Sequence, residues 1–376
     1  MQTDIIEGFE LSPQQKRLWL LQQNNLPYWA RLAIRIKGNL NVKILKESLY
    51  NLIDRHEILR TTFHSVPDHK FPIQSISDRT SIQWQEIDLR SLSIEKQEGK
   101  IEEFFQQEGQ YSFNLEQESL VRLTLLTLTA QKYILLLTLP TLCADTKTLG
   151  NIVKEISSFY VINGQNKSDS LPIQYVQFSA WQNEILEATG TGYWREKKIC
   201  DFLNFQLPFE VHLAKKSKFK SQFLAITLSP KTLAIIKDFV QKHNISTFVF
   251  FQTCWHILLW HLTQKPDIVI GTICDGRSYE GLDEGLGLFA KYLPIHCHLE
   301  DDDSFIKTLQ QVDQSTREAY AWQEYFAWEQ IVEKSENFDA ESLSLFYFDF
   351  EEQYDHYSGD EVSFTTYKQY TCIDRF

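Results

Sequence analysis

The stretch from Leu137 to Gly150 reads LTLPTLCADTKTLG and brings several reactive side-chain types close together. An apolar run ends at Pro140, and Thr141, Cys143 and Asp145 follow before a helical pattern begins. Loops between a strand end and a helix start often carry catalytic groups. This stretch contains no histidine that could serve as a general base.

Each of these side chains also has a structural interpretation. Thr141 could donate a hydrogen bond to a developing oxyanion, but the general behaviour of threonine favours a hydroxyl bonded to the local backbone. Cys143 could accept an acyl group, yet no histidine lies near it in the sequence, which favours a small buried residue. Asp145 could simply cap the helix that starts directly after it.

A second pair of candidates is found much later in the chain. His296 and His298 are two residues apart on a predicted strand, so their side chains point to the same face and could bind a metal. The sequence offers no third ligand nearby, which favours a solvated strand face, and no metal is expected. The cysteines lack CxxC pairs and zinc spacing, a pattern typical of reduced thiols in the core. They are Cys143, Cys200, Cys254, Cys274, Cys297 and Cys372.

Composition limits the class of protein. The chain is 43% hydrophobic and 14% aromatic, which indicates a folded globular protein. Its formal net charge is −13, and no block of lysine and arginine is available to neutralise phosphates, so nucleic acid is not an expected partner. The start, MQTDIIEGFELSPQQ, has neither a basic segment nor an apolar run. We therefore expect a cytoplasmic location, without a membrane partner.

The elements that position the Leu137 stretch can be read from periodicity. Apolar residues recur at helical spacing from Leu149 to Phe159, which predicts a helix that starts near Asp145 or Thr146 and ends at Tyr160. The preceding residues 121–140 predict a hairpin. The remaining predictions for this half are a helix opened by Ser12 and Pro13, a strand over 29–38 with Leu32, Ile34 and Ile36 on one face, a helix after Asn41 and an extended segment near Thr61.

The second half repeats the plan of strands and covering helices. It predicts a strand over 218–229, a helix over 230–244, an apolar helix over 245–262 capped by Ser246 or Thr247, a buried strand from 267 and another strand over 343–352. At 376 residues the chain is long for one core. Because NGQNKSDSLP is rich in turn residues, we predict an N-terminal lobe over 1–163, a linker over 164–172 and a C-terminal lobe over 173–376. The predicted class is α/β or α+β, with mixed sheets covered by helices.

Several separated stretches resemble one family, the condensation domains of nonribosomal peptide synthetases, which are relatives of chloramphenicol acetyltransferase. LSPQQKRLWLL, residues 11–21, resembles the opening SxAQxRLW signature, with Gln14 in place of the alanine. RHEILRTTF, residues 55–63, matches RHExLRTxF at every specified position. The resemblance marks as candidate tunnel or motif residues Arg17, Trp19, Arg55, His56 and Arg60.

The likeness continues in order along nearly the whole chain. YVQFSAWQ, residues 175–182, is similar to YxDFAxWQ, with Gln177 in place of the acid, and GLFAKYLPI, residues 287–295, is similar to IGxFVNTLxxR. YFAWEQIV and LSLFYFDFEE are looser likenesses of the remaining signatures. This adds to the candidate residues Tyr175, Trp181, Gln182 and Phe289, with Cys143 from the Leu137 stretch.

The family's catalytic signature, HHxxxDG, falls on the Leu137 stretch. Pro140 stands at the first histidine, Thr141 at the second and Thr146 at the glycine, whereas the aspartate is retained as Asp145. The resemblance implies that the second histidine assists attack of an acceptor amine on a donor thioester. It also implies that the aspartate is structural and pairs with an arginine, for which Arg277 in CDGR is the match. A buried carboxylate needs such a charged partner.

The resemblance further implies two chloramphenicol-acetyltransferase-like lobes in a V-shaped pseudodimer, with a substrate tunnel between them. Substrates would arrive on the 4′-phosphopantetheine arms of peptidyl or aminoacyl carrier proteins, an adenylation domain would adjoin the chain, and no cofactor would be bound to it. Family members usually continue beyond a phrase like the terminal CIDRF, so the second lobe is expected to be shortened at its end.

Loss of the histidine leaves three functions open. Positioned acid–base help is worth about 10²–10⁴ in rate, or roughly 3–5 kcal/mol, whereas holding reactants in attack geometry supplies about 7–11 kcal/mol. Peptide-bond formation could therefore be weak, redirected or lost. The alternatives are a non-catalytic module that recruits carrier or tailoring proteins, and a related ester-forming acyltransferase.

Overall fold

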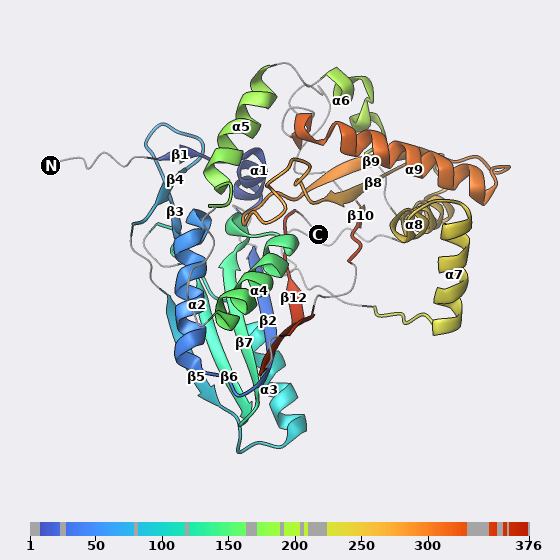
Figure 1. The fold of residues 1–376 in the computed structure, drawn as a ribbon. Helices are drawn as coiled ribbons and strands as arrows, with labels where there is room; N and C mark the ends of the chain where they lie inside the picture. Colours follow the sequence, from blue (N-terminus) through green and yellow to red (C-terminus); the bar gives the residue numbers. More distant parts are fainter. Residues whose placement is uncertain are drawn as a thin grey trace. The chain divides into compact units, whose positions relative to one another are not determined.

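The computed structural model describes residues 8–22, 28–78, 82–116, 120–162, 171–188, 192–203, 207–209, 224–328, 346–351, 356–358 and 361–374. Two compact units are formed by the chain. The first comprises residues 1–188, 275–291 and 352–376, and the second comprises residues 189–274 and 292–351. Each unit combines β-sheet with covering helices (Figure 1).

The first unit is built on a six-stranded sheet with the order β11-β12-β2-β7-β6-β5. Neighbouring strands are antiparallel except β5 and β6, which are parallel, so the sheet is mixed. The predicted hairpin over 121–140 is formed by β6 and β7. The strands are β2 (Trp29–Gly38), β5 (Gln83–Asp88), β6 (Arg122–Thr129), β7 (Lys132–Pro140), β11 (His356–Ser358) and β12 (Val362–Tyr370).

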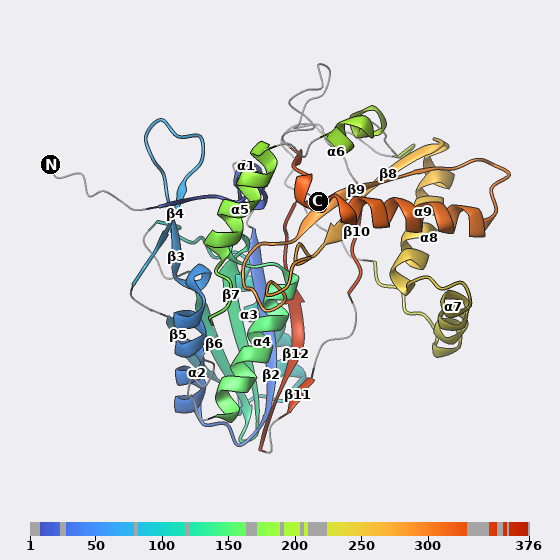
Figure 2. The ribbon, with the colours of Figure 1, turned by 45° about the horizontal axis from the view of Figure 1, so that its top comes forward.

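Helices cover both faces of this sheet, with α2 and α4 on one face and α3 on the other (Figures 1 and 2). The sequence predicted one buried face of β2, which carries Leu32 and Ile34, and both are 0% exposed. Ala33 on the opposite face is also 0% exposed, because it packs in a cluster with Ile101 and Phe105 of α3. The helices are α1 (Pro13–Gln22), α2 (Val42–Arg55), α3 (Ile94–Glu108), α4 (Thr146–Val161) and α5 (Tyr175–Ala188).

A small second sheet belongs to the same unit. Its strand order is β1-β4-β3, formed by β1 (Phe9–Glu10), β3 (Thr61–His64) and β4 (Ile73–Ile76). A short 3-10 helix, η1 (Glu57–Arg60), joins α2 to β3. The extended segment predicted near Thr61 is therefore β3.

The second unit has a three-stranded sheet with the order β10-β8-β9, in which β10 runs parallel to β8. Ser246 caps α8, since its side chain accepts a hydrogen bond from the Val249 amide at 3.1 Å. Apolar side chains of α8, α9, β8 and β9 form the core. The elements are α6 (Gly192–Glu196), η3 (Ile199–Phe202), α7 (Pro230–Lys242), α8 (Thr247–Thr263), β8 (Asp267–Cys274), β9 (Lys291–His298), α9 (Phe305–Ala321), η4 (Gln323–Tyr325) and β10 (Phe346–Phe348).

Two strand predictions for the second half differ from the structure. Residues 224–229 form neither helix nor strand, and residues 218–223 lie outside the described ranges. Leu224 and Ile226 are 90% and 79% exposed, so apolar alternation alone did not produce a paired strand. Of the strand predicted over 343–352, the described part holds only β10. Conversely, β12 was not predicted, because its partner β2 lies more than three hundred positions earlier in the chain.

The compact units are divided at a different place from the predicted linker over 164–172. Residues 163–170 lie outside the described part, so the linker stays a prediction. The division falls between 188 and 189, since α5 contacts α1 and β1 of the first unit. Residues 275–291 and 352–376 also return to the first unit, which a single cut in the sequence cannot represent.

No single helix in the described part of the chain is long and apolar enough to cross a membrane. Helices α7 and α8 pass a test of length and composition only when they are taken together, and they are bent by 104° relative to each other.

Candidate functional site

The Leu137 stretch forms a buried turn between β7 and α4. After β7 ends at Pro140, residues 141–143 form a 3-10 helix, η2 (Thr141–Cys143), and α4 begins at Thr146 as predicted. The Thr141 amide donates a hydrogen bond to the Tyr28 carbonyl at 3.0 Å, which holds the turn against the start of β2. The side chains of this turn are 0% exposed at Thr141, Leu142, Cys143, Ala144 and Asp145.

Asp145 accepts hydrogen bonds from five donors. Its Oδ1 atom accepts from the Thr148 amide at 2.8 Å and so caps α4. Arg277 donates from Nη1 to Oδ2 at 2.9 Å and from Nη2 to Oδ1 at 3.0 Å. The amides of Phe289 and Ala290 donate to Oδ2 at 2.9 and 3.0 Å. The cap and the ion pair, which were alternatives in the sequence, are both present in the structure.

Arg277 connects the loop over 275–291 to α4 through hydrogen bonds. Its Nη2 atom also donates to the Thr148 hydroxyl at 2.9 Å and to the Gly285 carbonyl at 3.1 Å, and its guanidinium lies 4.3 Å from the centre of the Phe289 ring. A buried ion pair offsets its desolvation cost only when further hydrogen bonds satisfy both ions. Both carboxylate oxygens and both Nη atoms are bonded here, whereas Arg277 Nε forms no hydrogen bond with any residue that the structure describes. The bonded atoms favour a structural role for Asp145 over proton transfer.

Helix α1 holds the other side of the turn through residues that sequence reasoning did not assign to the site. Gln15 donates from Nε2 to the Leu142 carbonyl at 2.9 Å. Gln14, which replaces the family alanine, donates to Gln182 Oε1 at 3.1 Å and to the Phe289 carbonyl at 3.2 Å. The departure of Gln14 from the family pattern was the signal that could have singled it out.

Tyr175 joins the same arrangement. Its phenol donates to the Leu288 carbonyl at 2.7 Å, and it lies 2.7 Å from the Ser12 hydroxyl. Burial raises the pKa of the Tyr175 phenol, so this group stays protonated as a donor. The structure therefore brings together Tyr175, Gln182, Phe289, Arg277 and Asp145 around the turn.

The residues of the RHE signature lie elsewhere in the first unit. His56 is 2% exposed, and its Nε2 atom is 2.9 Å from Glu155 of α4, which also lies 3.6 Å from Arg55. Arg60 donates to the Ser77 carbonyl at 2.6 Å. Ten residues of helix separate Glu155 from Asp145, or roughly 15 Å, so His56 lies apart from the turn.

The remaining arginine and tryptophans of the other signatures lie on α1 and α5. Arg17 pairs with Asp374 at 3.1 Å, and Trp19 is half-buried on α1. Trp181 contacts Tyr279 edge to face, with ring centres 4.9 Å apart, and it lines a cavity of about 250 Å³. That cavity is lined by Ile173, Gln177, Phe178, Trp181, Tyr279 and Leu282, and Thr141 is not among its lining residues.

Cys143 does not have the surroundings of a nucleophile. The side chain is fully buried, and burial raises the pKa of its thiol, which disfavours the reactive thiolate. All six cysteines are free. The expectation of core thiols holds for the buried Cys143, Cys274, Cys297 and Cys372, whereas Cys254 is exposed. The structure therefore favours the interpretation of Cys143 as a small core residue.

Thr141 occupies the centre of the turn without a partner for its side chain. Its hydroxyl is buried and forms no hydrogen bond with any residue that the structure describes. No described imidazole therefore bonds to it, and the backbone interpretation of the hydroxyl is not supported. A threonine hydroxyl cannot accept a proton at neutral pH as an imidazole can, so the turn lacks general-base chemistry.

The histidine pair acquires a third polar group. Asp267, at the start of β8, lies 2.9 Å from His296 and 2.8 Å from His298 at the end of β9. The sequence could not indicate this neighbour, because 29 positions separate Asp267 from His296 and only sheet pairing brings them together.

Comparisons with known proteins identify the family of the chain. The family profile of the condensation domain matches residues 6–371. Tyrocidine synthase 3 of Brevibacillus parabrevis is 27% identical over 335 residues, which are 87% of this chain and 5% of that protein. Malpinin synthetase of Mortierella alpina is 28% identical over 333 residues, which are 86% of this chain and 4% of that protein. The chain thus spans a small part of these curated relatives.

Solved structures show the same fold. The condensation domain from Monacolin K polyketide synthase has a TM-score of 0.73 and 21% identity, over 91% of this chain and 78% of that one. The X-domain in its complex with OxyB from teicoplanin biosynthesis has a TM-score of 0.71 and 22% identity, over 87% of this chain and 73% of that one. The profile match covers almost the whole chain, and the chain therefore belongs to the condensation domain family.

Proposed function

We propose that this chain is a condensation-type domain of a nonribosomal peptide synthetase in which peptide-bond formation is weak, redirected or lost. The observation that carries the proposal is Thr141, a buried residue that matches the position of the family's catalytic histidine and whose hydroxyl bonds to no described residue. The hydrogen-bonded frame around the turn is retained, as the Asp145–Arg277 pair illustrates. The chain thus keeps the frame of the site and lacks the proton acceptor.

The loss of catalytic rate without a general base can be estimated from typical contributions of base catalysis and of alignment. A positioned base contributes about 10²–10⁴ in rate, whereas alignment of two bound reactants contributes about 7–11 kcal/mol. A free amine is itself a nucleophile, so alignment alone would leave slow acyl transfer. Thr141 is completely buried, and a fully buried side chain cannot touch a substrate without rearrangement. We therefore expect the rate of acyl transfer by this chain to be very low.

The proposal includes the partners that the resemblance implies. The donor thioester and the acceptor amine would each be carried on the 4′-phosphopantetheine arm of a peptidyl or aminoacyl carrier protein, beside an adenylation domain. The two lobes in a V-shaped pseudodimer and the tunnel between them, which the resemblance implies, are parts of the same proposal. Pro140, Thr141, Asp145 and Arg277 would be its motif residues.

The test is an amide-formation assay with donor and acceptor loaded on carrier proteins. The unmodified chain should give little or no product, and the double variant Pro140→His with Thr141→His should gain about 10²-fold or more. Thr141→Val serves as the matched control, because it removes the hydroxyl without adding a base. Fast product formation by the unmodified chain and by Thr141→Val alike would contradict the assigned role of the missing histidine.

A second function, protein recruitment, is favoured by one comparison. A solved relative of the same fold is an X-domain in complex with OxyB. If this chain is likewise a docking module, carrier or tailoring proteins should bind to it in titration calorimetry while neither the unmodified chain nor the histidine-restored variant forms product. The ester-forming alternative is distinguished in the same assay by replacing the amine acceptor with a hydroxyl acceptor.

A further inference from the structure

Two imidazoles and one carboxylate meet at one end of the sheet in the second unit. Asp267 is the first residue of β8, and His296 and His298 lie at the end of β9, the neighbouring strand. Asp267 Oδ1 lies 2.9 Å from His296 Nε2 and 2.8 Å from His298 Nδ1. A single carboxylate oxygen therefore joins both rings, and none of these residues belongs to the site described above.

The surroundings keep the cluster ordered and accessible. Phe202 stacks on the His296 ring, with centres 4.5 Å apart and planes 15° from parallel, which orients the ring toward Asp267. The side chains of Asp267, His296 and His298 are 28%, 29% and 46% exposed. A solvated ion can reach all three groups.

We propose that Asp267, His296 and His298 bind one divalent first-row transition metal ion, of the class of Zn²⁺. Imidazole nitrogens and a carboxylate oxygen are ordinary ligands of such ions, and three protein ligands with water in the open position form a common site. Two nitrogen ligands out of three disfavour Mg²⁺ and Ca²⁺, which prefer oxygen. The sequence lacked the third ligand, and the pairing of β8 with β9 supplies it.

The metal requires one local movement. In the structure the three donor atoms do not all lie within 4.8 Å of one another, because the two rings approach the same oxygen from different directions. His298 is the most exposed of the three, so its ring is the one expected to turn when the three donors converge on an ion. His296 is held by Phe202 and would keep its orientation.

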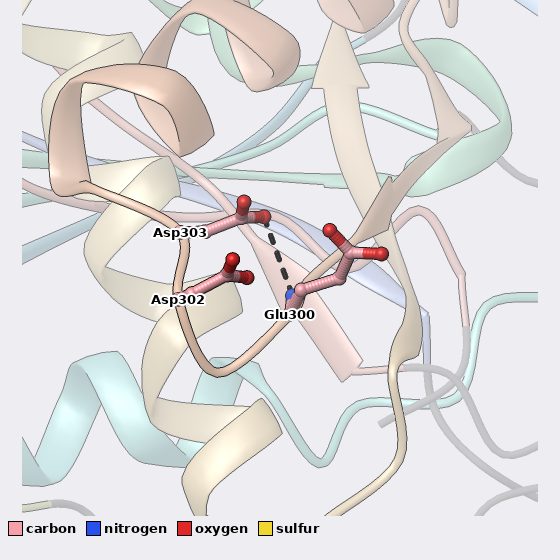
Figure 3. Close-up of side chains that lie close together, drawn as sticks. All are labelled: Glu300, Asp302 and Asp303. Atoms are coloured by element: carbon pink, nitrogen blue, oxygen red, sulfur yellow. Dashed lines mark hydrogen bonds between the residues drawn. The ribbon is translucent and has the colours of Figure 1, made fainter.

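A nearby group of three carboxylates is a weaker candidate for a metal site. Carboxylate oxygens of Glu300, Asp302 and Asp303 lie within 4.8 Å of one another, and Figure 3 shows the Glu300 amide bonded to Asp303. The Lys307 ammonium pairs with Asp303 and lies 3.5 Å from Glu300, so this group already has a cation. Glu300 Oε1 lies 3.9 Å from His298 Nε2 and adds negative charge beside the proposed site.

The experiment titrates Zn²⁺ into the untagged full chain by calorimetry and Co²⁺ by visible absorption, which reports nitrogen and oxygen coordination. One metal ion per chain is expected. His296→Gln and His298→Gln should each weaken binding by about 10–100-fold or more, since even residues behind the ligands have effects of this size. The controls are His261→Gln, an exposed histidine of α8, and Glu300→Gln, and both should keep the stoichiometry.

Several outcomes would overturn the proposal. The absence of saturable Zn²⁺ binding would do so, and so would unchanged binding in both histidine variants. Loss of binding in Glu300→Gln alone would move the ion to the acidic group. Circular dichroism without metal verifies that each variant folds. Because Zn²⁺ should also raise the thermal midpoint of the unmodified chain, and of neither histidine variant, the result does not depend on any condensation activity.

Discussion

Arg277 and Asp145 form a two-point ion pair, 132 positions apart in the sequence, with both side chains 0% exposed. The pair joins the loop over 275–291 to the first turn of α4. It thereby fixes the turn that carries Thr141, although neither charged group touches that hydroxyl.

Removal of the Asp145 charge should strongly destabilise the first unit. Asp145→Asn would leave the Arg277 guanidinium buried without a counter-ion, and breaking a buried pair in this way costs about 3–5 kcal/mol. Urea unfolding followed by circular dichroism measures the effect. Glu284→Gln, which breaks an exposed pair with Lys154, is the control and should change the free energy of unfolding by less than about 1 kcal/mol. Equal effects of the two variants would refute the structural role.

Two glycines of the same region should respond to alanine in opposite directions. Gly287 has φ +149°, and a Cβ atom there would collide with the Tyr175 ring, so Gly287→Ala should lower the free energy of unfolding by more than about 1 kcal/mol. Gly150 lies inside α4 with no atom within 4 Å of an added Cβ. Gly150→Ala should therefore stabilise the protein by about 0.5–1 kcal/mol. Thermal unfolding of both variants checks the contrast.

Two threonines near the turn should also differ. Thr141→Val removes a buried hydroxyl that has no described partner, so stability should stay the same or rise by about 1 kcal/mol. Thr148 donates to the Gly287 carbonyl at 2.7 Å and accepts from Arg277 at 2.9 Å. Thr148→Val should cost about 1–3 kcal/mol, because the buried Gly287 amide, which donates to the Thr148 hydroxyl at 3.1 Å, would lose this acceptor. A large loss in Thr141→Val would show that its hydroxyl has a partner.

His256 should make the second unit sensitive to acid. Burial lowers the pKa of this imidazole to about 4 from an ordinary value of 6.5, although hydrogen bonds with the carbonyls of Gln252 and Ile295 oppose the shift. Between pH 6.5 and pH 4 the unfolded chain takes up a proton here and the folded chain does not. The free energy of unfolding should therefore fall by about 3 kcal/mol as the pH decreases through this window.

The measurement is urea unfolding at pH 7, 5.5 and 4 for the unmodified chain and for His256→Gln. The variant should show a weaker dependence on pH, because it lacks the imidazole that protonates only on unfolding. His261→Gln, which changes an exposed histidine of the same helix, should follow the unmodified chain. If His256→Gln also follows the unmodified chain, another group causes the acid sensitivity.

The sequence by itself determined the local elements and the family. Periodicity located α4 and the hairpin of β6 and β7, since a helix and a tight hairpin depend on neighbouring residues. The ordered signatures indicated the condensation domain family, which the profile match confirms. The placement of Thr141 at the position of the family's histidine rests on the resemblance of short motifs and stays a prediction.

Only the tertiary structure revealed the features that depend on contacts between residues far apart in the sequence. Strand β12 exists because β2 offers it an edge, and Leu224 and Ile226 stay exposed because no described strand pairs with them. Asp267 meets His296 and His298 through the same kind of long-range contact. Long-range pairing and burial depend on which distant surfaces meet, and no local pattern of residues encodes that.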